Sequence, residues 1–157
     1  RHGRLDPRLA RSGQVDRMKL DVLRRYRAQL EEVVRMDLVR LRQELQDAEA
    51  RSHLLDEQMK LTADASLAKA GGGVALDEFL VWQALVAAET SNLTAAMQVE
   101  GQLREAWNQK QEELREAMQD RRTLDCLAER MRQQHRHVQH RVEQMEMDEV
   151  ARRRSVM

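Results

Sequence analysis

The histidines of the segment HRHVQH come nearest to a set of residues whose type and spacing could do chemistry. His137 and His140 lie three positions apart, so on a helix they could share a face with Glu143, as metal ligands on one helix do. His135 belongs to a different face of such a helix. We therefore interpret the three as solvated histidines of an arginine-rich helix, and we expect no metal site and no cofactor.

The remaining reactive groups form no recognisable catalytic set. The GGG triplet at 71–73 lacks the preceding strand and the following GK[ST] of a phosphate-binding loop. Cys126 is the only cysteine, which excludes an internal disulfide, and we expect it on the outer face of a helix. Without a pocket, no Ser-His-Asp or Cys-His set can be assembled, so we expect no catalytic residues and no enzymatic activity.

The composition indicates long helices in place of a thick globular core. Of the 157 residues, 34% are charged and only 3% are aromatic, and Pro7 is the single proline. The sequence is rich in Leu, Ala, Glu, Gln, Arg and Met, which all favour helices. No apolar run approaches the ~18 to 20 residues of a membrane span, and no secretion signal opens the sequence, so we expect a cytoplasmic protein without membrane insertion.

A first helix is predicted from apolar residues that recur every three or four positions and so share one face. They are Leu23, Tyr26, Leu30, Val34, Leu38, Leu41, Leu45, Ala48, Leu55 and Met59, with Ser52 as the weak member. The two steps of four from Leu30 to Leu38 predict one break in the heptad repeat.

A longer second helix is predicted after the glycines, with the same spacing from Phe79 to Met145. Its seam, the set of positions that faces the other helix, contains Phe79, Trp82, Val86, Leu93, Ala96, Leu103, Trp107, Leu114, Ala117, Leu124, Ala128, Met131, Val138, Val142 and Met145. The same frame places five polar residues on the seam: Glu89, Glu100, Lys110, Arg121 and His135.

The glycines are expected to reverse the chain, because glycine readily adopts the left-handed conformation that ends a helix. Residues whose numbers sum to about 144 should then face each other, as Leu41 and Leu103 would. We predict an all-α fold: a long two-helix antiparallel coiled-coil hairpin with the second helix longer than the first. The expected boundaries are 18–69 for the first helix, 70–74 for the turn and 75–152 for the second helix, which form a single domain over 18–154.

The two predicted arms are unequal, so residues after Leu124 should lack a partner unless residues 1–17 fold back on them. Residues 1–17 contain Pro7, Gly3 and Gly13 and are expected to be a disordered leader, or upstream sequence before a start at Met18. The sequence leaves open whether residues 1–17 belong to the native protein. It also does not fix how far the second helix continues past His135.

Charge is divided unevenly along the chain. Residues 1–17 and 121–157 are basic, whereas residues 69–120 carry four basic and nine acidic side chains. Acidic residues interspersed among the C-terminal arginines reduce their local excess to three charges, so we expect no nucleic-acid binding.

Two motifs, one near each end of the sequence, carry a family resemblance. The first is the stretch KLDVLRRYRAQLEE, with Val-Leu, Tyr-Arg and Glu, and the second is the ending EQMEMDEVARRR, with Glu143, Gln144, Asp148, Glu149 and Ala151. They resemble the opening and the C-terminal Glu-Gln-x4-Asp-Glu-x-Ala pattern of the FliJ family of flagellar type III export proteins. Length and hairpin pattern agree over nearly all of residues 18–154.

The resemblance implies a cytoplasmic coiled coil similar to the stalk of rotary ATPases, peripheral at the inner-membrane export apparatus and monomeric when alone. Such proteins bind the hexameric export ATPase and promote its assembly, contact the cytoplasmic part of the export gate and help to recycle export chaperones. The positions expected to bind the ATPase are Met131, His135, Val138, Val142, Met145, Asp148, Glu149 and Ala151. Those expected to bind the gate, near the turn, are Leu55, Met59, Trp82 and Val86.

Two alternatives remain open from the residues alone. The first is a related YscO-type stalk protein of a virulence secretion system, and the second is a homodimeric coiled-coil scaffold in which the glycines form an open hinge. Chaperone partners are not specified by the sequence.

Overall fold

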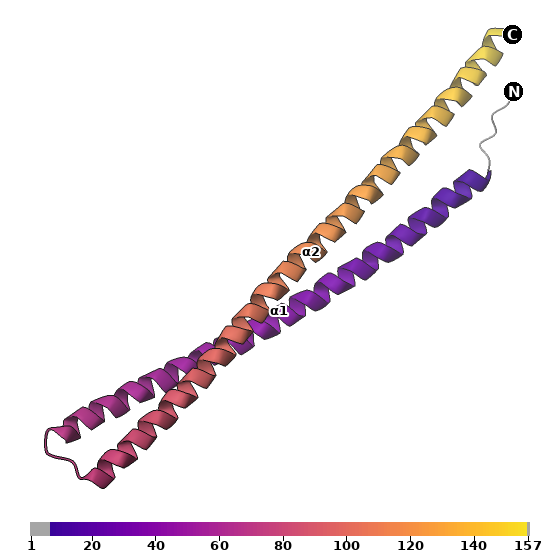
Figure 1. The fold of residues 1–157 in the computed structure, drawn as a ribbon. Coiled ribbons are helices and arrows are strands. Elements are labelled where there is room, and N and C mark those ends of the chain that lie inside the picture. The colour runs from indigo at the N-terminus through magenta and orange to yellow at the C-terminus, as the bar shows by residue number, and fades with distance from the viewer. Residues whose placement is uncertain (1–6, 157) are drawn as a thin grey trace. The chain divides into compact units, whose positions relative to one another are not determined.

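The structure, a computed structural model, describes residues 7–156 and consists of two helices. α1 runs from Pro7 to Ala70 over 64 residues, and α2 runs from Leu76 to Val156 over 81 residues (Figure 1). The two pack against each other as an all-α antiparallel hairpin, and α2 is the longer, as the sequence predicts. α2 continues unbroken past His135, the residue beyond which the sequence does not fix its extent.

α1 begins well before residue 18, so the expectation of a disordered leader is wrong for residues 7–17. Pro7 is the first helical residue, a position where its missing N–H costs no hydrogen bond and its fixed φ suits the helix. Gly13 weakens this segment by only about 1 kcal/mol, which does not end the helix. Residues 1–6 of the expected leader lie outside the described residues.

The turn after α1 is built on Gly73. The Gly72 N–H donates to the Lys69 carbonyl at 3.1 Å, so the first glycines continue the last turn of α1. Of the three glycines in the turn, Gly73 alone has a positive φ, 82°, the left-handed conformation expected of a residue just past a helix end. α2 then opens with Asp77 and Glu78 in its first turn, where the helix dipole favours negative charge.

The chain forms two compact units, each containing a segment of both helices. The terminal unit comprises Arg1–Glu32 and Arg115–Met157, and the turn unit comprises Val33–Leu114. Over the residues that the structure describes, buried apolar side chains are few: Leu45 and Ala96 in the turn unit and Ala128 in the terminal unit. Each unit is therefore a thin helix pair stabilised along a seam, without a layered core.

The seam of α2 follows the predicted frame. Ala96 and Ala128 are buried, and the predicted polar members Glu89, Glu100 and Lys110 are half-buried on the same face. His135 and Met145, at the far end, are exposed. The single apolar frame from Phe79 to Met145 thus describes α2 correctly over most of its length.

The seam of α1 differs from the prediction in its first half. From Val34 onward the expected residues are buried or half-buried, Ser52 included, but Leu23, Tyr26 and Leu30 are exposed. Their places are taken by half-buried and buried residues that keep the heptad spacing unbroken: Gly13, Arg17, Leu20, Arg24, Arg27 and Glu31. The predicted break between Leu30 and Leu38 is therefore wrong, because charged side chains continue the seam.

The register also differs from the expected one. The rule from the glycines places Asp120 opposite Arg24 and Trp82 opposite Thr62. In the structure Arg24 pairs with Asp125 at 2.8 Å, and the Thr62 hydroxyl donates to Glu89 Oε1 at 2.8 Å. Because Gly71 and Gly72 follow the last turn of α1, the reversal falls after Gly73, and the partners lie further along α2 than expected.

Candidate functional site

The terminal unit contains an apolar groove between α1 and α2, here called the terminal groove. Its volume is about 630 Å³. α1 contributes Ala10, Gly13 and Arg17, and α2 contributes Met131, Gln134, His135, Val138, Gln139, Val142 and Glu143. Small residues on α1 leave the aliphatic side chains of α2 uncovered, and Val138 is 45% exposed. The groove therefore offers an apolar surface that the described residues of the unit do not fill.

Four of the eight residues expected to bind the ATPase line this groove. They are Met131, His135, Val138 and Val142. The other four, Met145, Asp148, Glu149 and Ala151, are exposed further along α2, where Glu149 pairs with Arg153 at 3.0 Å. The expectation that α2 is unpaired after Leu124 is wrong, because α1 reaches back to Pro7 and contributes one wall of the groove.

The α1 residues of the groove were missed because their segment was assigned to a disordered leader. The signal that could have found them is the spacing of Gly13, Arg17, Leu20 and Arg24, which keeps the three- and four-residue steps of the later seam. Hydropathy alone hides this signal, since two of the four residues are arginines.

A cluster of ion pairs, here called the charged seam, holds the helices of the terminal unit in register. Glu31 Oε2 accepts from Arg121 Nη1 at 3.0 Å, and Asp125 Oδ1 lies 2.8 Å from Arg24 Nη2. Arg27 Nη1 is 3.3 Å from Asp120 Oδ2. Such charge-assisted contacts are directional, so they specify which residues of α1 and α2 meet.

The turn unit contains a second hollow of about 560 Å³, here called the tip pocket. Trp82 and Val86, two of the residues expected to bind the gate, line it together with Phe79. Leu55 and Met59 do not; they lie half-buried on the seam of α1. The α1 wall is made instead by Ser66, Lys69 and Ala70.

Lys69 is the residue of the tip pocket that sequence reasoning missed. Its Nζ lies 5.7 Å from the centre of the Trp82 ring, within the range of a cation–π contact. A basic residue in the last turn of a helix is also favoured by the helix dipole, which is the signal that could have drawn attention to it.

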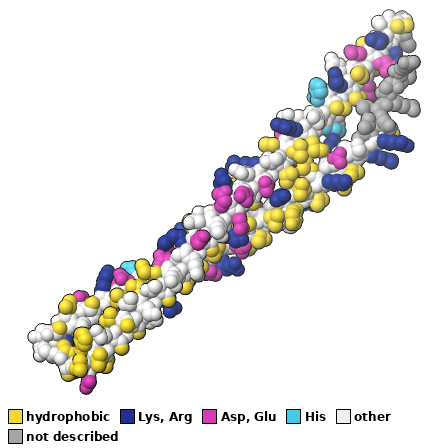
Figure 2. Space-filling view, in the orientation of Figure 1, with side chains coloured by type: hydrophobic (Ala, Val, Ile, Leu, Met, Phe, Trp, Pro, Cys, Tyr) yellow, Lys and Arg dark blue, Asp and Glu magenta, His cyan; other side chains and the backbone are white. Residues whose placement is uncertain are grey.

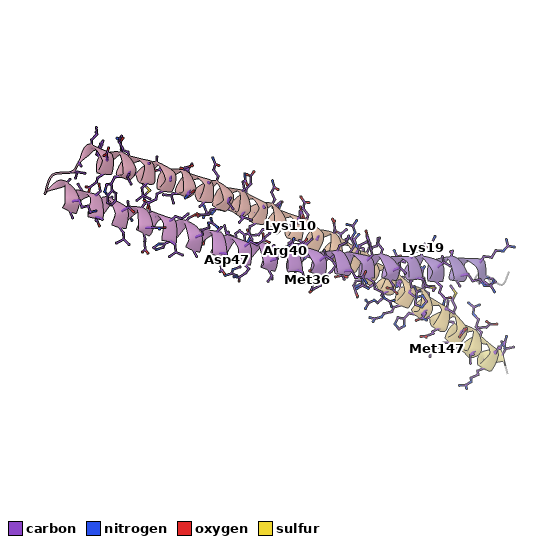
Figure 3. All side chains as sticks on the ribbon, turned by 90° about the horizontal axis from the view of Figure 1, so that it is seen from below. Lys19, Met36, Arg40, Asp47, Lys110 and Met147 are labelled. Carbon is purple, nitrogen blue, oxygen red and sulfur yellow. The ribbon has the colours of Figure 1, made fainter. Side chains whose placement is uncertain are left out.

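Two basic residues join the helices deeper in the turn unit. Arg104 Nη2 lies 2.8 Å from Glu100 and 3.3 Å from Glu49, and these hydrogen bonds raise the pKa of the guanidinium. Lys110 Nζ lies 2.9 Å from Glu113 and 3.5 Å from Asp37, and the hydrogen bond with Glu113 raises its pKa. Figure 3 shows Lys110 on α2 beside Arg40 on α1, which also pairs with Asp37. Both cations therefore stay charged throughout the physiological range.

The histidines of the HRHVQH segment do not converge. His140 Nδ1 lies 3.8 Å from Glu143, while His135 belongs to the terminal groove. Over the described residues, no group of three or more His, Cys, Asp or Glu is placed to hold a metal ion. Cys126 is exposed on α2.

Comparison with known proteins decides the family. The family model described as "Flagellar FliJ protein" matches residues 16–156, which include almost all of both helices. The chain belongs to the FliJ family. Searches of curated proteins and of solved structures found no match.

FliJ membership makes the chain a component of the flagellar export apparatus, in a family whose role in export is not catalytic. Neither helix, over the described residues, contains a stretch long and apolar enough to cross a membrane.

Proposed function

We propose that this FliJ-family chain acts as a stalk-like coiled coil that binds the hexameric export ATPase and promotes its assembly and activity. We further propose that it couples the ATPase to the export gate and escorts export chaperones. The observation that carries the ATPase assignment is the terminal groove, where four of the residues expected from the family's pattern lie together around an open apolar surface. Family membership favours the flagellar system over a virulence secretion system.

Charge supports two different partners for the two units. Residues 33–114 carry eight Lys or Arg and fourteen Asp or Glu. The rest of the chain carries nineteen Lys or Arg and thirteen Asp or Glu. The turn unit is thus negative by six charges and the terminal unit positive by six. A positive terminal unit would be steered toward an acidic ring interior, and this attraction would raise the association rate at low salt.

The ATPase assignment is tested at Val138. A Val138→Asp substitution places a carboxylate in the terminal groove, where docking would have to desolvate it, so the concentration for half-maximal stimulation of the cognate ATPase should rise about tenfold or more. Stimulation is measured by phosphate release while circular dichroism follows helicity.

Gln133→Asp is the matched control, because it introduces the same side chain and charge at an exposed position of α2 outside the groove. It should stimulate as the parent protein does. Equal stimulation by both variants at unchanged helicity would show that the groove is not the contact.

The gate assignment is tested at Trp82. Aromatic anchors dominate many protein interfaces, so Trp82→Ala should weaken binding to the cytoplasmic domain of the export gate about tenfold or more. Tyr26→Ala removes an exposed aromatic side chain from the terminal unit and should leave that affinity unchanged. Calorimetric titration measures both, and similar losses in the two variants would contradict a gate contact at the tip pocket.

A further inference from the structure

The first turns of α2 are apolar on the side that does not face α1. The residues of this side, here called the outer apolar face, are Leu76, Leu80, Val81, Ala84 and Ala88. All five are exposed, with Leu76 72%, Val81 68% and Leu80 53% accessible. Figure 2 shows hydrophobic side chains gathered at the turn end of the molecule, at lower left. A helix that is apolar all round normally has its outer side covered.

The outer apolar face is distinct from the tip pocket. Trp82 and Val86 lie on the pocket side of the helix. Leu80 precedes Trp82 by two positions and Ala84 precedes Val86 by two positions, so these two residues lie on the opposite side. The two surfaces can therefore be altered independently, and a partner of the outer apolar face does not depend on the proposed ATPase or gate contacts.

The shape of the face favours a helix as its occupant. From Phe79 onward this stretch of α2 has no free backbone groups to pair with an added strand, because each N–H and C=O takes part in the helix ladder. Ala84 and Ala88 follow Leu80 at steps of four and are small, so a second helix could approach closely and place larger side chains over them.

The charge around the face specifies the sign of that helix. Residues 71–103 contain no Lys or Arg, and their four charged residues are Asp77, Glu78, Glu89 and Glu100. Asp77 lies on this side, three and four positions before Leu80 and Val81, and it is exposed and makes no ion pair within the described part of the chain, whereas Glu78 lies on the Trp82 side. A second copy docking through the same face would bring like charges together there, and an anionic membrane surface would be repelled.

We propose that the outer apolar face is a docking site for an amphipathic helix of a partner protein whose polar side is rich in lysine or arginine. The apolar residues of that helix cover Leu80, Val81 and the alanines, while its basic residues meet Asp77. This arrangement is the helix-on-helix mode of peptide recognition, with affinity from burial and selectivity from charge.

The test uses a fluorescein-labelled synthetic amphipathic helix of leucine and lysine, and a twin in which glutamate replaces every lysine. Anisotropy titrations of the full chain should give saturable binding of the lysine peptide, weakening as NaCl rises from about 50 to about 300 mM, and no binding of the glutamate peptide. Equal binding of both peptides, or no saturation up to about 200 µM of the chain, would overturn the proposal.

Variants locate the site. Leu80→Gln with Val81→Gln should weaken lysine-peptide binding about tenfold or more, since two exposed apolar contacts are lost. Asp77→Asn should weaken it severalfold and flatten the salt dependence. The matched control, Leu54→Gln with Leu61→Gln, removes two equally exposed leucines from α1 and should change nothing.

Two further outcomes count against the proposal. If the control pair weakens binding as much as the α2 pair, the peptide binds exposed apolar side chains without regard to site. If sedimentation shows a dimer that Leu80→Gln with Val81→Gln dissociates, the face binds a second copy of the chain.

Discussion

Among the large side chains of the described residues, the only fully buried one is a carboxylate. Glu31 is 1% exposed, and it sits on the seam of α1 where the sequence suggested its neighbour Leu30. Burying a charge is tolerated only if it is paired, and Arg121 supplies the partner at 3.0 Å. Arg121 keeps 44% of its side chain exposed, so water still solvates part of the pair. The contact therefore specifies register more than it adds net stability.

Removing the charge of Glu31 tests whether the buried carboxylate depends on its contact with Arg121. Glu31→Gln keeps the shape but weakens the contact to Arg121, so the free energy of unfolding should fall by about 1 to 3 kcal/mol. Glu146→Gln removes an exposed carboxylate of α2 and should change it by no more than about 0.5 kcal/mol. Urea denaturation followed by circular dichroism measures both, and equal effects of the two substitutions would contradict a special role for Glu31.

At the scale of helices, the sequence predicts the second helix better than the first. On α2 the apolar residues alone define the seam, and the same frame correctly includes Glu89, Glu100 and Lys110. On the first half of α1 the seam is largely ionic, and hydropathy cannot separate an arginine that faces another helix from one that faces water. A seam predicted from hydropathy therefore contains Leu23, Tyr26 and Leu30, which are exposed in the structure.

The candidate sites were predicted in part for the same reason. The α2 wall of the terminal groove follows from the apolar frame, whereas the α1 wall lies in a segment whose composition suggested disorder. At the tip pocket, Trp82 and Val86 line the hollow, whereas Leu55 and Met59, which come from the family resemblance, do not, and Ser66, Lys69 and Ala70 form the α1 wall. The register between the helices differed from the expected one because a turn's apex depends on which glycine becomes left-handed, which spacing alone does not specify.

Gly72 and Gly73 are predicted to respond differently to substitution. Gly73 has φ of 82°, a conformation that costs an L-residue about 1 to 2 kcal/mol, so Gly73→Ala should lower the free energy of unfolding by about that amount. At Gly72 an added Cβ would lie 3.8 Å from the Lys69 carbonyl, an ordinary contact, and Gly72→Ala should be neutral or stabilising by up to about 1 kcal/mol. Thermal melts of both variants measure the difference. Similar melting points would show that Gly73 is not the strained position.

For the whole molecule, the division of charge and the short turn bear on how the chain behaves in solution. The terminal and turn units carry opposite net charges, which suits two different partners. A domain-swapped dimer could nevertheless reproduce every contact between α1 and α2, because the same residues would meet across two chains. Because the helix contacts are the same in a monomer and in a swapped dimer, the connection between the helices determines which of the two forms.

The turn favours the monomer. Residues 71–75 let α2 fold back on α1 of the same chain, and a short flexible connection gives an effective concentration in the millimolar range. At about 10 µM protein, light scattering should therefore give the mass of one chain, 18.4 kDa.

Replacing Gly71, Gly72 and Gly73 together by alanine should allow α1 to continue into α2 as one helix, since alanine is the best helix former and cannot easily adopt the left-handed turn. That variant should double in mass through pairing with a second copy. A parent protein that is already a dimer would support the homodimeric scaffold over the hairpin stalk, whereas a monomeric triple-alanine variant would show that the seams, and not the glycines, reverse the chain.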